Sequence, residues 1–156
     1  MTLTDTTAAT QSESISFELD LHHPPDKVWR ALTDPALLAQ WLLPVVEMKL
    51  TPGATFTLQA PPQPGWDGSV HCRMKDVQAQ RRISYTWAVG DLDTLVTFEL
   101  TATASGTRLS IVQTGFKEHQ KKNFGGARYG WRLMGGRLVD LLSTRKADVS
   151  QDASFS

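Results

Sequence analysis

The stretch HHPPDKVWRALTDPALLAQWL, residues 22–42, has the pattern of two short helices placed end to end. Its double proline suits the start of a helix, because a proline in the first turn lacks only an N–H that would be unpaired there anyway. Apolar residues then recur at helical spacing over residues 28–32. Asp34 and Pro35 interrupt this run, and a second apolar helical run follows over residues 37–42. The sequence therefore predicts two short helices in succession.

Strand patterns lie on both sides of these helices. Before them, residues 15–21 alternate between apolar and polar side chains, as in a strand with one buried face. After them, alternating runs are separated by Gly, Pro and Asp turns, which favours an antiparallel meander. The expected strands after the helices are Val45–Leu50, Ala54–Ala60, Ser69–Val77, Ile83–Val89, Leu92–Thr103 and Thr107–Phe116.

A long helix is expected last, from about residue 118 to residue 143. Its apolar residues recur at spacings of three and four, which predicts one amphipathic face. Five glycines interrupt it, and each costs roughly 1 kcal/mol relative to alanine inside a helix. We therefore expect either that the helix approaches the sheet closely or that space is left open beside it. The glycines are Gly125, Gly126, Gly130, Gly135 and Gly136.

The composition is that of one soluble globular domain. The chain has 156 residues, of which 40% are hydrophobic and 21% charged. Sixteen Lys and Arg balance sixteen Asp and Glu, so the chain lacks the positive charge typical of nucleic-acid and anionic-membrane binders. No apolar run approaches the roughly 20 residues that span a membrane. We expect no nucleic-acid partner and no integral membrane association.

The ends of the chain and its single cysteine predict further properties. Residues 1–13 are rich in Thr, Ser and Ala and do not resemble a signal sequence, so we expect a disordered N-terminal tail. Residues 144–156 are polar and small, which predicts a flexible C-terminal tail after a folded domain at 14–143. One thiol, Cys72, cannot form an intramolecular disulfide. This pattern favours a reducing, cytoplasmic location.

Three segments resemble one protein family. The segment at 22–42 is similar to the N-terminal motif of the subfamily named after the activator of the heat-shock protein 90 ATPase, in which VWxAL is followed by TDPxxLxxWL. GTRLSIVQTGF at 106–116 resembles its penultimate-strand motif, and YGWRLMGGRLVDLL at 129–142 resembles its terminal helix. The three motifs occur in the right order.

This subfamily belongs to the START-like (SRPBCC) superfamily, and the resemblance implies its α+β helix-grip fold. In that fold an antiparallel sheet, here of six or seven strands, wraps around the long C-terminal helix, with two short helices after the first strand. The resemblance also implies an apolar cavity between sheet and helix, but no shared chemistry, because functions vary widely on such folds.

We expect the cavity to be lined by residues on the inward strand registers, by aromatic residues and by the terminal helix. Each aromatic residue could instead fill the core, and Trp66, in a Pro/Gly loop, could form a lid. Gln113 would either orient a ligand or bond to a neighbouring side chain or an ordered water, and Arg128 would flank the cavity or face solvent. The candidates are Trp41, Phe56, Leu58, Trp66, Val70, Trp87, Phe98, Ile111, Gln113, Arg128, Trp131, Met134 and Gly135.

The sequence gives little support to metal, cofactor or acid–base chemistry. His22 and His23 are adjacent, so on an extended strand they would point to opposite faces, and no third ligand has suitable spacing. Cys72 has no neighbouring base that would lower its pKa. The inward positions contain no Asp, Glu or His. We predict no metal site, no cofactor and no catalytic residue.

Three functions are compatible with these observations. The first is non-catalytic binding or carriage of a small hydrophobic molecule such as a lipid, sterol or polyketide-like compound, which the apolar inward registers favour. The second is a polyketide cyclase-like or aromatase-like enzyme, which requires a buried ionisable group beside the ligand. The third, stimulation of a chaperone ATPase, is suggested by the subfamily name and disfavoured by the neutral charge. A homodimer is compatible with the pattern and is not determined by it.

Overall fold

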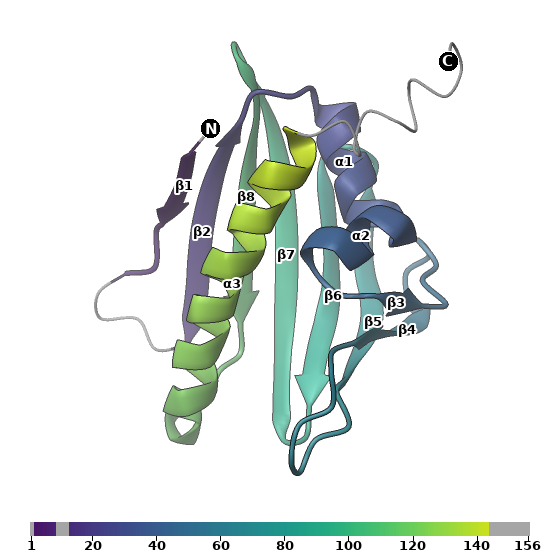
Figure 1. Ribbon diagram of the computed structural model, residues 1–156, viewed down its shortest axis with the longest axis vertical. Coiled ribbons are helices and arrows are strands. Elements are labelled where there is room, and N and C mark those ends of the chain that lie inside the picture. Colours follow the sequence, from purple (N-terminus) through teal and green to yellow (C-terminus); the bar gives the residue numbers. More distant parts are fainter. Residues whose placement is uncertain (1, 9–12, 144–156) are drawn as a thin grey trace.

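The computed structural model describes residues 2–8 and 13–143. Within them, eight strands form one antiparallel sheet in the order β1-β2-β8-β7-β6-β5-β4-β3, and three α-helices lie on one of its faces (Figure 1). The strands are β1 (Thr2–Asp5), β2 (Ser14–Leu21), β3 (Val45–Val46), β4 (Thr55–Gln59), β5 (Ser69–Gln78), β6 (Arg82–Val89), β7 (Leu92–Thr103) and β8 (Gly106–Thr114). The helices are α1 (Pro25–Thr33), α2 (Pro35–Trp41) and α3 (Lys121–Leu142), with a 3-10 turn η1 (Glu118–Gln120) before α3.

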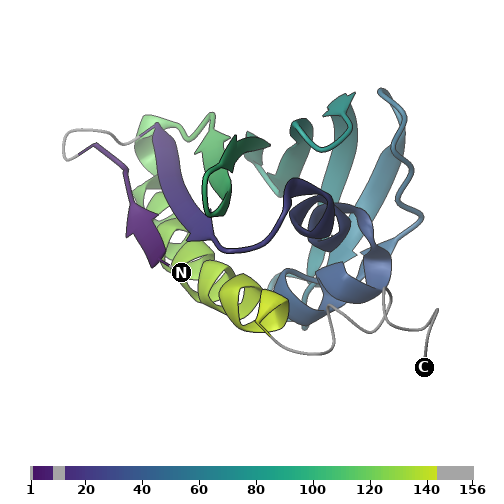
Figure 2. The ribbon, with the colours of Figure 1, turned by 90° about the horizontal axis from the view of Figure 1, so that it is seen from above.

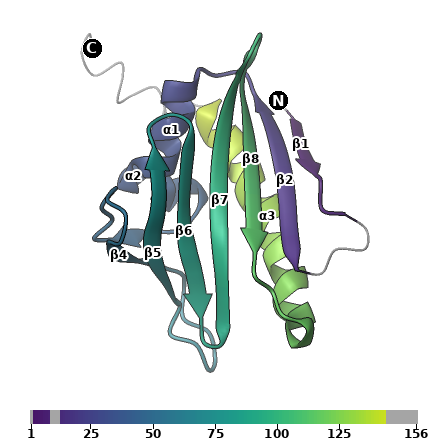
Figure 3. The ribbon, with the colours of Figure 1, turned by 180° about the vertical axis from the view of Figure 1, so that it is seen from behind.

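The helix-grip fold expected from the sequence is confirmed. Seen from above, the sheet curves, and the helices lie on its concave side (Figure 2). The reverse view shows the convex face, which no helix of the described residues covers (Figure 3). Along β7, the alternation of buried Val96 and Phe98 with partly exposed Thr97 and exposed Glu99 follows this division.

Two expectations about the strands differ from the structure. Residues 2–5 were expected to be disordered, yet they form β1, an eighth strand that pairs with β2 from Thr2 opposite Asp20 to Asp5 opposite Phe17. The strand expected over 45–50 is limited to β3, because Glu47 has φ 60°, a left-handed conformation that ends an extended run. The C-terminal tail expected at 144–156 lies outside the described residues.

The two short helices are held together by hydrogen bonds from residues of the TDP and WL motifs. The Asp34 carboxylate accepts a hydrogen bond from the Ala36 N–H at 2.9 Å, which caps the start of α2. The Trp41 indole N–H donates to the Ala31 carbonyl oxygen at 2.8 Å and so ties the end of α2 to α1. These bonds give the motif a structural role.

The C-terminal end of α3 is fixed by α1. Lys27 is buried, and its Nζ donates a hydrogen bond to the Leu142 carbonyl oxygen at 3.0 Å. Carbonyls in the last turn of a helix have no partner within the helix, and a cation there also interacts favourably with the helix dipole. The helix therefore ends against α1.

Strand β1 is fastened to α3 as well as to β2. A Cβ on Gly135 would lie 3.1 and 3.3 Å from the two terminal carbons of Leu3, so the glycine leaves a notch that Leu3 fills. The Asp5 carboxylate accepts hydrogen bonds from Arg128 at 2.6 Å and from Arg132 at 3.1 Å. Gly135 therefore serves a close approach of β1, which is one of the two explanations that the sequence left open.

We predict that Gly136→Ala stabilises the protein and that Gly135→Ala does so less. A Cβ on Gly136 would meet no atom within 4 Å, so the substitution should raise the free energy of unfolding by about 0.5–1 kcal/mol through helix propensity alone. At Gly135 the new methyl group must displace Leu3, which offsets that gain. Urea unfolding of both variants measures the difference. A gain at Gly135 equal to that at Gly136 would contradict the packing of Leu3.

We also predict that Asp5→Asn loosens β1 without unfolding the sheet. The substitution keeps the shape of the side chain and removes its charge, which weakens its bonds to two partly exposed arginines by about 1 kcal/mol. Amide hydrogens of residues 3–5 should then exchange roughly five-fold faster. Glu99→Gln, which removes a carboxylate paired with Arg82 far from β1, is the matched control and should leave this exchange unchanged.

The attachment of β1 to α3 through Asp5 should also depend on pH. Burial raises the pKa of Asp5, but hydrogen bonds from Arg128 and Thr7 outweigh it, so the pKa of the folded state is lowered. A lowered pKa stabilises the folded state above the unfolded pKa of about 4 and loses that contribution as pH falls through the folded value. Wild-type β1 should therefore loosen below about pH 4, once corrected for intrinsic exchange. Asp5→Asn should lack this step.

Candidate ligand-binding site

Aromatic rings gather between the sheet and the helices. They come from three strands, from α2 and from α3, and they meet at centroid distances of 5.0 to 6.3 Å in edge-on or tilted geometry. Such geometries are the favourable ones for aromatic pairs. We call this group the aromatic cluster: Phe56, Tyr85, Trp87, Phe98, Trp131 and Trp41. The structure thus brings together five of the residues expected to line the cavity, and adds Tyr85.

A chain of hydrogen bonds runs through the cluster. The Trp131 indole N–H donates to Gln113 Oε1 at 2.7 Å, and Gln113 Nε2 donates to the Thr94 hydroxyl at 2.9 Å. The Thr94 hydroxyl donates in turn to the Trp87 carbonyl oxygen at 2.8 Å. Of the two roles that the sequence allowed for Gln113, the structure supports the bond to neighbouring side chains, because both ends of its amide are occupied. This chain fixes α3 to β8, β7 and β6.

The other expected residues fall into three environments. Leu58, Val70 and Ile111 are fully buried on the inward registers of β4, β5 and β8, and Met134 is half-buried on α3. Arg128 does not flank the interior, because its guanidinium binds Asp5 of β1. Gly135 leaves room for Leu3 and not for a cavity.

Trp66 lies apart from the cluster, at one wall of an open groove of about 480 Å³. The groove is formed by the loop before β5, the turn between β6 and β7, and the first turns of α3. Trp66 is held in place because its indole N–H donates to the Ser69 carbonyl oxygen at 3.0 Å. The lining residues are Trp66, Val89, Leu92, Lys122, Asn123, Gly126 and Ala127.

The groove adjoins the aromatic cluster on two elements. Ala127 stands one helical turn before Trp131, and residues four apart lie on the same face of a helix. Val89 stands two residues after Trp87, and residues two apart share one face of a strand. The groove therefore lies next to Trp87 and Trp131 of the aromatic cluster.

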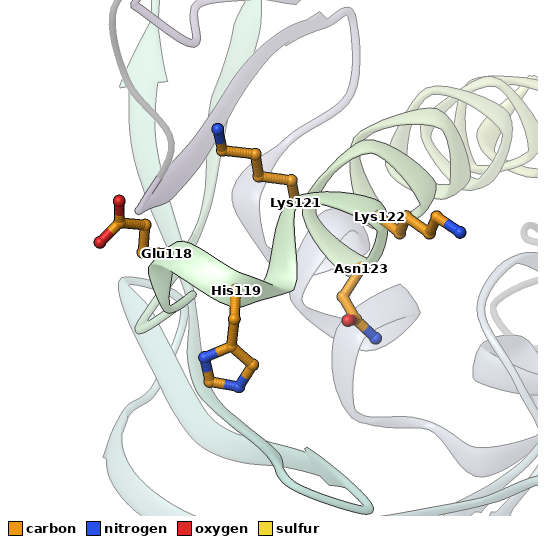
Figure 4. A pocket seen from close by; sticks show the side chains of 5 residues that line it. All are labelled: Glu118, His119, Lys121, Lys122 and Asn123. Carbon is orange, nitrogen blue, oxygen red and sulfur yellow. The ribbon is translucent and has the colours of Figure 1, made fainter.

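A second open pocket, of about 660 Å³, surrounds η1 and the start of α3. Its side chains are polar and point in different directions, with Glu118 and Lys122 on opposite sides (Figure 4). His119 is used in an exposed pair with Asp91 at 3.4 Å. No charged side chains converge in this pocket, so we regard the apolar groove as the better candidate site.

Two buried groups of the described residues have raised pKa values, Cys72 and Tyr85. Burial raises the pKa of the Cys72 thiol to about 12, despite a hydrogen bond that lowers it. Burial, followed by the nearby Cys72, raises the pKa of Tyr85 well above its ordinary value. Both groups are therefore protonated at neutral pH. In the described residues no group of three or more His, Cys, Asp and Glu is arranged to hold a metal ion.

Residue-by-residue interpretation of the sequence missed Tyr85 as a site residue. The alternation of Ile83, Tyr85 and Trp87 places it on the inward face of β6, but only Asp, Glu and His were considered there as ionisable groups. It also missed Val89 and Leu92, because the meeting of a hairpin turn with α3 has no local sequence signal.

Comparisons with known proteins agree with this geometry. The family model described as activator of Hsp90 ATPase homolog 1-like protein matches residues 22–143. No curated protein matches the chain. No helix of the described residues is long and apolar enough to cross a membrane.

Several solved structures have a similar fold. Protein MLL2253 from Mesorhizobium loti is 36% identical, with a TM-score of 0.78, and the match covers 83% of this chain and 96% of that one. DynU16, a putative protein in the dynemicin biosynthetic locus, is 25% identical with a TM-score of 0.73 over 86% of this chain. The match spans 48% of the length of DynU16. CalU16 from Micromonospora echinospora, 23% identical with a TM-score of 0.71 over 97% of this chain and 90% of that one, shares the fold.

We predict that Gln113→Leu lowers the free energy of unfolding by about 1–3 kcal/mol, because it leaves the buried Trp131 N–H without its acceptor. Trp131→Phe should also destabilise the protein, by leaving the Gln113 amide oxygen unpaired. The double variant removes both partners, so its loss should be smaller than the sum of the two single losses. Strict additivity in urea unfolding would contradict the energetic coupling of α3 to β8 through this bond.

Proposed function

Because the chain belongs to the family of activator of Hsp90 ATPase homolog 1-like proteins, we propose that it binds a small hydrophobic molecule between its sheet and α3 and catalyses no reaction on it. The observation that carries this proposal is the groove between the Trp66 loop, the β6–β7 turn and α3, which adjoins the aromatic cluster. Ligand sites in proteins are typically concave, mostly apolar and furnished with few polar groups. The site has these properties.

The chemistry of the interior supports binding over catalysis. A general base must be deprotonated to accept a proton, and a nucleophilic cysteine must be a thiolate. The raised pKa values of Tyr85 and Cys72 keep both groups protonated at neutral pH. The amide of Gln113 is occupied by Trp131 and Thr94. Within the described residues, the interior thus offers surfaces for contact, and its Cys72 and Tyr85 supply neither a base nor a thiolate at neutral pH.

The expected class of ligand is a flat or elongated apolar molecule of small size. Edges and faces of tryptophan and phenylalanine rings pack well against flat ligands, since rigid rings lose little conformational entropy on binding. That one structural relative is a putative protein of the dynemicin biosynthetic locus also favours a small organic ligand over a macromolecule.

The proposal predicts stabilisation by apolar compounds. A thermal-shift screen of lipids, sterols and aromatic polyketides should yield binders, because a ligand at a hundred times its Kd adds about 2.7 kcal/mol to the free energy of unfolding. For a chain of this size that gain raises Tm by roughly 5–10 °C. Native mass spectrometry should show one bound molecule per chain. The absence of any stabilising compound from all three classes would contradict the proposal.

A side chain that fills the groove should weaken ligand binding. Gly126 lines the groove, and a Cβ there would meet no atom within 4 Å, so Gly126→Phe places a ring in the groove without a clash at the backbone. We expect Kd to rise at least roughly ten-fold. Gly125→Phe is the matched control, because Gly125 also has open space but does not line the groove, and its Kd should stay near that of the wild type. Equal Kd values for the two variants would place binding elsewhere.

A further inference from the structure

The Tyr85 hydroxyl differs in its hydrogen bonding from the other buried polar groups of the aromatic cluster. Tyr85 is 1% exposed and lies in the aromatic cluster between the rings of Phe56 and Phe98. The hydroxyl has no hydrogen-bond partner among the described residues. By contrast, the buried indole N–H groups of Trp41 and Trp131 are both bonded to protein acceptors. A hydroxyl that has no protein partner keeps its donor for a guest molecule or for water.

The hydroxyl must border a small space. Among the described residues, every side-chain nitrogen and oxygen that is sealed from solvent has a hydrogen-bond partner. Because the Tyr85 oxygen has none, it is not sealed, although its side chain is almost entirely covered. The interior therefore has room beside this oxygen for at least part of a small guest atom or a water molecule.

The inward face of β6 runs from the groove to Tyr85. Val89, which lines the groove, Trp87 and Tyr85 alternate along the inward face of β6. Four residues of strand span about 13 Å, so the Cα atoms of Tyr85 and Val89 lie about that far apart. The side chain of Trp87 is half-buried, so this face is partly accessible beyond the groove. Val89, Trp87 and Tyr85 thus form one row of side chains between the groove and the hydroxyl.

We propose, on the basis of the function above, that Tyr85 donates a hydrogen bond to a carbonyl oxygen of the bound molecule, so that the ligand is an apolar ketone or quinone and not a pure hydrocarbon. A carbonyl only accepts, and it therefore satisfies the phenol without adding a donor that needs a partner of its own. A carboxylate would be buried without a counter-charge, because Lys27 is the one buried cation in the described part of the chain and its ammonium group donates to the Leu142 carbonyl oxygen. Tyr85 acts as an orienting group, and no covalent bond is made or broken.

The raised pKa of Tyr85 agrees with this role. A phenol that stays protonated remains a donor throughout the neutral and mildly alkaline range. Affinity for a ketone should therefore be independent of pH between about 6 and 9, well below the ordinary tyrosine pKa.

The test compares two ligands of the same shape on two variants. 2-Acetylnaphthalene carries a carbonyl group, and 2-isopropenylnaphthalene replaces its oxygen by a methylene group while keeping the substituent planar. Tyr85→Phe keeps the ring that packs against Phe56 and Phe98 and removes only the hydroxyl. We expect Tyr85→Phe to weaken binding of the ketone roughly 3- to 10-fold in an NMR titration and to leave binding of the hydrocarbon within two-fold of the wild type. Tyr129→Phe is the matched control, because Tyr129 is 61% exposed on α3.

A spectroscopic measurement reports the bond directly. The infrared carbonyl stretch of bound 2-acetylnaphthalene should lie at lower frequency in the wild type and in Tyr129→Phe than in Tyr85→Phe. If the wild type binds both compounds and Tyr85→Phe changes neither the Kd of the ketone nor its stretch, this inference is wrong and the proposed function stands. If the wild type binds neither these compounds nor any in the thermal-shift screen, both are wrong.

Discussion

The hydrogen bond from the Trp131 indole to the Gln113 amide holds the long helix on the sheet and thereby shapes the interior. It is 2.7 Å long and buried, and Gln113 passes the connection to Thr94 and on to the carbonyl of Trp87. In a medium of low polarity such a chain is expensive to break, because each member would be left without a partner. The position of Trp131 relative to β6 and β7 is therefore fixed, and with it the aromatic rings that meet there.

The other attachments of α3 act at its two ends. Lys27 holds the C-terminal turn through the Leu142 carbonyl, while Gln120, just before the helix, bonds to the carbonyl of Asp91 at 3.2 Å. Between these two ends, strand β1 packs against α3 through Leu3 and binds it through Asp5. The groove lies beside Gly126 and Ala127, between these attachments.

This arrangement explains why few polar groups are available to a guest. The indole N–H groups of Trp41, Trp66 and Trp131 bind protein carbonyls or the Gln113 amide, so the tryptophans present surfaces and no free donors from those nitrogens. Tyr85 is the exception among the fully buried members of the aromatic cluster, since its neutral hydroxyl has no acceptor in the described residues. Specificity in an apolar site comes from its few polar groups, because apolar contacts alone discriminate weakly between molecules of the same shape.

The sequence by itself determined the fold class, the order of the elements from β2 onward and which face of these strands is buried, because periodicity and turn residues act locally. It also placed Gln113 and Trp131 in the interior, and the motifs at 22–42, 106–116 and 129–142 identified the family. Only the tertiary structure decided that Gln113 bonds to Trp131, that Arg128 binds Asp5, that Gly135 makes room for Leu3, and that Trp66 meets α3 at a groove. Each of these contacts joins residues from different elements, often more than 100 positions apart, and no local pattern specifies which distant partner an inward or helical side chain will meet.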